Sequence, residues 1–173
     1  MNNMKKFFCY IILACMFLML VACGKPSSQK TFENFFKEFQ TDLIKREEKS
    51  VEPFKTILKI YEKTTYKINK VEEKGENSEL NVTIKAINLD KYVNEYIAAV
   101  TKKYGENIPA DKQEEFNKFS VEYFTNILND KNVEYVENDV NVKMQKVEGE
   151  WKITNPNELV SAILGGAGNL IGL

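Results

Sequence analysis

The sequence predicts an α+β domain in which helices pack on one face of a curved antiparallel sheet. Two patterns lead to this fold class. Some segments repeat apolar residues at helical spacing, and others alternate apolar and polar residues as strands do. Helices and hairpins occur in separate blocks along the chain, an order that is typical of α+β folds. The chain has 173 residues, enough for one hydrophobic core, so we expect a single domain.

Residues 1–22 have the composition of a secretory signal peptide. Lys5 and Lys6 precede an uncharged run from Phe7 to Ala22, which ends in a cysteine and a polar stretch. A helix formed by this run would measure roughly 24 Å, less than the hydrocarbon core of a bilayer at roughly 30 Å. A cleaved leader is therefore favoured over a permanent transmembrane anchor.

The junction LVACG at residues 20–24 closely resembles the lipobox of bacterial lipoproteins. The resemblance implies that the sulfur of Cys23 is acylated, that the peptide bond before it is cut, and that Cys23 becomes the membrane anchor. Two or more acyl chains are needed, because a single chain binds a bilayer only weakly. The alternative is an ordinary signal peptide with an accidental cysteine. The resemblance implies that the domain lies outside the cytoplasm, lipid-anchored on the cell membrane or the outer membrane.

The charge and the cysteine content of the chain exclude some classes of binding partner and site. Loss of Lys5 and Lys6 with the leader would change the net charge from −1 to −3. A mildly acidic chain without a basic block argues against nucleic acid as a partner, so contact with the membrane is expected through the lipid. Cys9 and Cys15 would be removed, which leaves Cys23 as the single thiol and excludes a disulfide framework or a cysteine metal site.

Residues 23–30 are predicted to form the lipidated cysteine and a short solvated tether, because the stretch after Cys23 contains Gly, Pro and Ser but no apolar residue. The domain is expected over residues 31–165. Thr31 is the expected N-cap of a first helix, and Pro53 suits the first turn of a second. Their apolar stripes, interpreted as core, are Phe32, Phe35, Phe36, Phe39 and Leu43 in the first helix and Phe54, Ile57, Leu58 and Tyr61 in the second.

Two hairpins are predicted from alternating patterns. One lies within residues 64–87 and turns at Gly75, and the other lies within residues 140–153 and turns at Gly149. Each strand has an apolar and a polar side, so we expect a sheet with one buried and one wet face. The apolar positions are Tyr66, Ile68, Leu80, Val82, Ile84 and Ala86 in the first hairpin and Val140, Val142, Met144, Trp151 and Ile153 in the second.

Two further helices are expected between the hairpins. The first begins at Leu89 and stops at Gly105, and the second covers residues 116–128, with Asp111 as a candidate N-cap before it. Their apolar residues again recur at helical spacing, which predicts that one side of each helix is buried.

A short helix is predicted to close the domain. Asn155 is its expected N-cap, Pro156 its first residue, and Gly165 with Gly166 its stop. Residues 166–173 form a small apolar tail. We interpret the tail as a frayed end, because chain termini are usually poorly ordered, and the alternative is a segment that docks on a partner.

The stretch from Asn141 to Gly166 combines a lysine-rich strand, a glycine turn, a tryptophan at the start of the returning strand and a short helix ending in Gly-Gly. In this stretch the chain resembles small bacterial lipoproteins of unknown function whose domain is similar to the nuclear-transport-factor-like or cystatin-like cone. The resemblance implies a curved sheet wrapped around a helix with an apolar mouth. Because such folds include enzymes and non-enzymes, the resemblance does not determine the function.

Catalytic machinery is scarce in this sequence. The chain has no histidine, and its serines lack a Gly-x-Ser-x-Gly setting. Asp90, Asp130 and Asp139 are the candidates for an acid/base site, but each also suits a cap or a turn. The acidic segment 129–139 lacks the central glycine and closing glutamate of a calcium loop. We therefore expect no cofactor, no metal and no enzymatic activity. The alternative is a hydrolase-like or isomerase-like enzyme that uses a carboxylate and a tyrosine.

A binding function is the preferred interpretation, with a small apolar ligand or another envelope protein as the partner. Side chains with an apolar body and a polar tip suit a pocket or an interface. The same side chains also suit a plain core in which each polar tip finds a backbone partner. The candidates are Tyr66, Tyr92, Tyr96, Tyr123, Tyr135 and Trp151.

Overall fold

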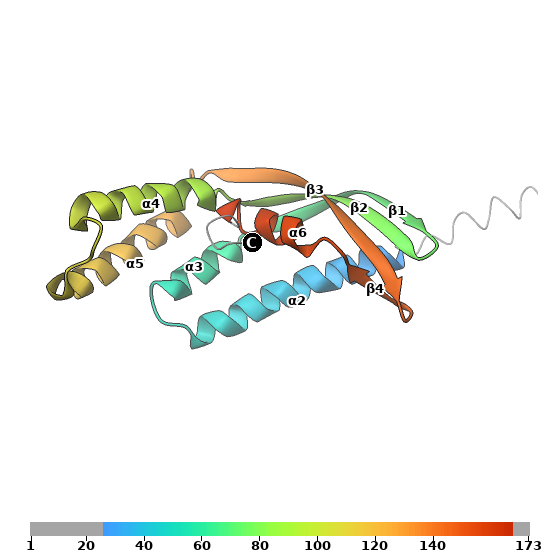
Figure 1. The fold of residues 1–173 in the computed structure, drawn as a ribbon, viewed down its shortest axis with the longest axis horizontal. Coiled ribbons are helices and arrows are strands. Elements are labelled where there is room, and N and C mark those ends of the chain that lie inside the picture. Colours follow the sequence, from blue (N-terminus) through green and yellow to red (C-terminus); the bar gives the residue numbers. More distant parts are fainter. Residues whose placement is uncertain (1–25, 168–173) are drawn as a thin grey trace, which may run out of the picture.

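The structure is a computed structural model that describes residues 26–167. It confirms the α+β class and the predicted order of elements (Figure 1). The predicted leader, Cys23 and the tail beyond Ala167 lie outside the described residues. The elements are α2 (Ser27–Lys49), α3 (Phe54–Tyr61), β1 (Thr65–Lys74), β2 (Asn77–Ile87), α4 (Leu89–Tyr104), the 3-10 turn η2 (Ala110–Lys112), α5 (Gln113–Asn129), β3 (Tyr135–Val147), β4 (Glu150–Ile153) and α6 (Pro156–Ile163).

The sheet is open and antiparallel, with its strands in the order β1-β2-β3-β4. Its β1–β2 register shifts between Ile68 and Lys70, so that Asn69 is an extra residue in β1. Because side chains alternate along a strand, this bulge moves Val71 and Glu73 onto the face that the helices cover. The sequence pattern predicted the strand but not the bulge.

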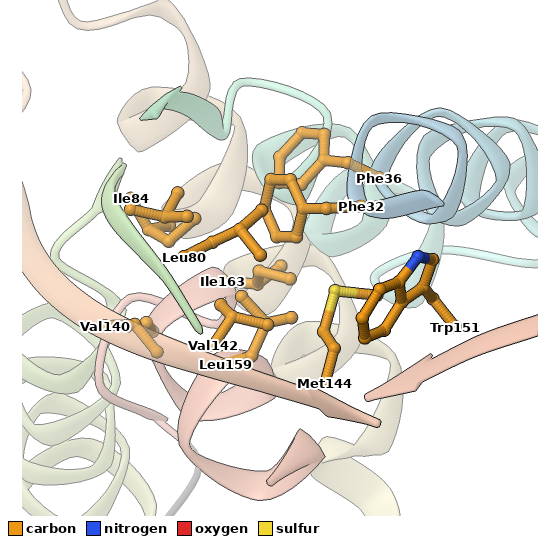
Figure 2. Packing of buried hydrophobic residues seen from close by; sticks show 12 residues of the cluster. Phe32, Phe36, Leu80, Ile84, Val140, Val142, Met144, Trp151, Leu159 and Ile163 are labelled. Carbon is orange, nitrogen blue, oxygen red and sulfur yellow. The ribbon is translucent and has the colours of Figure 1, made fainter. Parts of the chain in front are cut away.

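The main core lies between this face and the helices α2 and α6. Leu80, Val82 and Ile84 of β2 are fully buried there, as their alternation predicted. Phe32 and Phe36 of α2 belong to the same core cluster as these strand residues, and Figure 2 shows the two rings beside Leu80. The inside of the domain is therefore packed, and each large apolar side chain buried in it contributes roughly 1.5–3 kcal/mol to folding.

A second core joins α3 to the helical hairpin α4–α5. Ile60, Ile87, Leu89 and Phe124 are its best buried members. In Figure 1, α4 and α5 extend beyond the end of the sheet, away from the β1–β2 and β3–β4 turns. The molecule is elongated as a result, with hairpin turns at one end and the α4–α5 connection at the other.

Gly165 lies at the predicted end of the last helix, and the backbone at this position requires a glycine. Its φ is +60°, and a Cβ at this position would overlap the carbonyl oxygen of Ile87. The same close approach lets the carbonyl of Gly165 accept a hydrogen bond from the amide of Asp90 at 3.2 Å. The chain end after α6 is thus joined to the start of α4.

Two expectations about helix starts were wrong, and a third was right in position only. α2 begins at Ser27 rather than at Thr31, so residues 27–30 of the predicted tether are helical. The residue before α5 is Lys112, not Asp111. Asn155 occupies the N-cap position of α6 and Pro156 is its first residue, as predicted, but the Asn155 side chain makes no capping hydrogen bond. It accepts a hydrogen bond from the amide of Lys143 and donates one to the carbonyl of Asn141, both at 2.8 Å.

Candidate functional site

A groove with a volume of about 940 Å³ lies between α2 and α3. We call it the α2–α3 groove. Apolar side chains supply most of its walls, and charged side chains of α2 form its rim. The apolar lining consists of Phe35, Phe39 and Leu43 of α2, Phe54, Leu58 and Tyr61 of α3, and Leu164 after α6.

The angle between α2 and α3 is held by polar contacts on both sides of the groove. Near the connecting loop, Glu47 of α2 forms ion pairs with Lys55 at 3.5 Å and Lys59 at 3.4 Å. At the other end, the side-chain amide of Gln40 donates to the carbonyl of Thr64 at 3.1 Å, and the Thr64 hydroxyl donates to the carbonyl of Ile163 at 3.2 Å. The groove is therefore bounded by fixed walls.

α3 is a short helix whose start depends on a glutamate. Glu52 accepts hydrogen bonds from the amide of Thr56 at 3.2 Å and from its hydroxyl at 2.7 Å. This turn leaves Phe54 pointing outward, with 54% of its surface exposed, although its spacing predicted a core position. Val51 in the connecting loop is 80% exposed. An apolar surface thus extends from the groove onto the loop.

The chemistry available in the groove is limited. Burial raises the pKa of the Tyr61 hydroxyl, so this group is a neutral hydrogen-bond donor or acceptor at physiological pH. The carboxylates of the lining, Glu38 and Asp42, are exposed at the rim. A buried carboxylate beside a tyrosine, which the enzyme alternative needs, is not found among the groove residues that the structure describes. The groove suits binding by apolar contact.

Three of the predicted binding residues come together, but inside the α4–α5 hairpin. The Tyr123 hydroxyl donates to the carbonyl of Tyr92 at 2.9 Å, and the Tyr96 hydroxyl lies 2.6 Å from the hydroxyl of Ser120. Tyr92 in turn accepts from the amide of Glu134 at 2.9 Å. Burial also raises the pKa of Tyr123, with a smaller contribution from the charge of Glu95. These tyrosines hold the hairpin together.

The other three predicted residues lie apart from that group, two of them in the main core and one at the surface. Tyr66 packs edge-on against Phe32 in the main core, with ring centres 5.3 Å apart. Trp151 is buried in the same core and donates from its indole nitrogen to the Ser27 hydroxyl at 2.8 Å. Tyr135 is exposed at the start of β3, with the Lys85 ammonium 5.2 Å from its ring centre. The structure does not gather the six into one pocket.

The three aspartates considered for catalysis lie on different elements and are exposed. Asp90 is in the first turn of α4. Asp130 follows α5 and accepts from the amide of Asn132 at 2.8 Å, as a turn residue does. Asp139 accepts from the Thr83 hydroxyl at 2.5 Å on the polar face of the sheet. Within residues 26–167, no cluster of three or more His, Cys, Asp or Glu side chains is placed to hold a metal ion.

The groove itself was not predicted. Phe35, Phe39 and Phe54 were assigned to the core by their spacing, and spacing alone does not show the angle between two helices. One signal was present in the sequence: the first two helices carry five phenylalanines, and apolar side chains that the core does not bury mark an interaction site.

The fold and the groove define an α+β domain with a packed interior and an open, largely apolar groove on its surface. The chain belongs to the family described as "Domain of unknown function (DUF5105)", whose model matches residues 22–164. No curated protein and no solved structure matches the chain. Among residues 26–167, no helix is long and apolar enough to cross a membrane.

Proposed function

We propose that the protein is a lipoprotein of the bacterial cell envelope that is anchored through Cys23 and binds an envelope protein in the α2–α3 groove. It acts without catalysis, and the likeness to the nuclear-transport-factor-like or cystatin-like cone is part of the same proposal. The anchoring is supported by the LVACG junction and by the family match. That match begins at residue 22, one residue before Cys23, so the matched region starts close to the expected mature chain.

The exposure of Phe54 is the observation that carries the binding proposal. Small-molecule pockets bury most of their ligand, whereas this groove is open and its Phe54 wall is half exposed. The space between sheet and helices, where a small ligand was expected, is filled by side chains (Figure 2). A protein segment that covers the groove would bury both Phe54 and the half-buried Phe35 and Phe39.

An amphipathic helix is the segment that fits the groove best. The lining runs from Asn34 to Arg46 on α2, a length of about 18 Å or three helical turns. Helices commonly bind by placing apolar residues at i, i+3, i+4 and i+7 in such a groove. The rim carries both signs of charge, with Lys37, Lys45 and Arg46 beside the two acids, and so suits the polar flanks of an amphipathic helix.

Site-specific cross-linking tests this proposal. A photoreactive amino acid replaces Phe54 in cells, and the matched control places it at Ile97 of α4, which is 50% exposed on another surface. We expect one protein adduct from position 54 that is missing at position 97. The cross-linked peptide, mapped by mass spectrometry, should carry apolar residues at helical spacing.

Two results would contradict the proposal. Equal adducts from both positions, or none from position 54, would show that the groove is not a specific interface. An adduct of small-molecule mass at position 54 would replace the protein partner by an apolar ligand.

A further inference from the structure

The start of α2 is joined to the sheet by a group of five residues, which we call the N-terminal clasp. Glu73 of β1 accepts from the Ser27 hydroxyl at 3.0 Å, and from the Ser28 hydroxyl at 2.8 Å. The Ser78 hydroxyl of β2 donates to that of Ser28 at 2.8 Å, and Trp151 of β4 donates to Ser27 at 2.8 Å. Three strands thus hold the first turn of the helix.

The clasp lies at the end of the sheet that carries both hairpin turns. Glu73 and Ser78 are paired across the β1–β2 turn, and Trp151 comes two residues after Gly149 of the β3–β4 turn. From this end, β2 runs about 35 Å toward α4. α4 then adds about 24 Å in the same general direction along the molecule (Figure 1). The α4–α5 connection is therefore on the order of 50 Å from the clasp.

The chain between Cys23 and the clasp is very short. Cys23 lies four residues before Ser27, and extended chain spans at most about 3.5 Å per residue, which gives a limit of about 14 Å. A lipid on Cys23 keeps that residue at the bilayer surface. The clasp must then lie within the same distance of the surface, whereas the α4–α5 connection is several times farther along the molecule.

We infer that the end of the sheet with the β1–β2 and β3–β4 turns faces the bilayer and that the α4–α5 hairpin points away from it. This inference rests on the proposed lipidation of Cys23. The turn residues suit a headgroup surface, since Lys74 and Lys146 alternate with Glu76 and Glu148, and Val147 is partly exposed between them. The domain is therefore held at the bilayer by the lipid on Cys23 rather than by a patch of basic side chains.

The orientation can be measured on the lipidated protein in vesicles of phosphatidylcholine and phosphatidylglycerol. Cys23 is acylated and the leader cysteines are removed, so a single new cysteine takes a fluorescent label. Glu76→Cys and Glu148→Cys place the label at the two turns. Glu106→Cys, exposed next to Gly105 in the α4–α5 connection, is the matched distal control.

Lipids with a quencher on the headgroup provide the readout. We expect loss of most of the fluorescence for the labels at 76 and 148 and little loss for the label at 106. A flexible linker of about twenty Gly and Ser residues inserted after Gly24 should remove this difference, because such a chain reaches about 25 Å on average. Equal quenching at the three positions, or more at 106, would overturn the orientation.

The experiment distinguishes a failure of the proposed lipid anchor from a failure of the proposed orientation. The mass of the mature protein and its retention on the vesicles are measured first. An unmodified Cys23 with protein free in solution would overturn the lipid anchor and the orientation together. An acylated, vesicle-bound protein with equal quenching at all positions would overturn the orientation alone.

Discussion

Glu73 accepts two hydrogen bonds from Ser28, one from the backbone amide at 3.2 Å and one from the hydroxyl at 2.8 Å, across 45 residues of sequence. The first amides of a helix lack partners within the helix, and their dipoles favour a negative charge nearby. The glutamate of β1 therefore supplies the cap that the residue before α2, Pro26, does not provide.

Removing this charge should destabilise the domain. For Glu73→Gln we expect a decrease in the free energy of unfolding on the order of 1 kcal/mol, as for the loss of a helix cap. Urea titration of the chain with Cys23→Ser, which omits the lipid, measures the change. Glu150→Gln, an exposed position at the start of β4, is the control and should behave like the parent. An equal loss in both variants would show that the clasp adds no stability.

The Glu73 carboxylate should also make the free energy of unfolding depend on pH in the acidic range. Burial alone would raise the pKa of Glu73, but the hydrogen bonds from Ser28 and Ser27 outweigh it and lower the pKa in the folded state. A lowered pKa contributes stability that is complete above the unfolded value of about 4.3 and is lost as the pH falls through the folded pKa. The difference in unfolding free energy between parent and Glu73→Gln should therefore shrink between pH 5 and pH 3. A constant difference would contradict this assignment.

Exposed and buried groove residues should respond differently to substitution. Phe54→Ser should leave the unfolding free energy within about 0.5 kcal/mol of the parent, because Phe54 is mostly outside the core. It should nevertheless weaken partner cross-linking from a photoreactive group at position 39. Leu58→Ala removes a buried side chain and should cost about 2–5 kcal/mol. A folded Phe54→Ser protein with undiminished cross-linking would rule out this wall as part of the interface.

The proposed lipid anchor predicts that membrane attachment depends on Cys23. Cys23→Ala should abolish acylation and leave an uncleaved precursor, since no sulfur remains to take the lipid. Metabolic labelling with a fatty-acid analogue and the electrophoretic mobility of the protein report the two steps. Ser27→Ala, four residues away, is the control and should be processed normally. Normal processing and membrane retention of Cys23→Ala would refute the lipoprotein assignment.

Two glycines with similar backbone angles should differ in their tolerance of a side chain. Gly75 and Gly165 have φ of +61° and +60°, a region where a Cβ costs roughly 1–2 kcal/mol. Space around Gly75 is open, whereas a Cβ on Gly165 would overlap the Ile87 carbonyl. Gly165→Ala should therefore reduce the unfolding free energy clearly more than Gly75→Ala. Equal effects would indicate that the backbone near Ile87 shifts freely.

Periodicity was sufficient to predict the elements and most of the core. The alternation of Leu80, Val82 and Ile84 predicted the buried face of β2, and helical spacing predicted that Phe32 and Phe36 are buried. These patterns work because burial on one side of an element repeats at a fixed interval in the sequence.

Features that depend on distant residues were not predictable in the same way. The first turn of α2 is capped by Glu73, which faces α2 because Asn69 adds a bulge to β1, and neither relationship has a local signal. The candidate binding tyrosines were chosen by residue type, but their hydroxyls form internal hydrogen bonds, as in Tyr123 and Tyr96. The groove depends on an interhelical angle that Glu47 and Gln40 help to set.

The bulge at Asn69 and the side chain of Asn155 have a consequence for the solubility of the protein. A long regular edge strand invites pairing with the edge of another molecule and so promotes aggregation. The bulge interrupts such an edge on β1, where Lys67, Lys70 and Lys74 add charge. On β3, the amide of Asn155 occupies backbone groups of Asn141 and Lys143 next to the short strand β4. The edge strands of neighbouring copies therefore do not readily pair into a shared sheet, even at high local concentration.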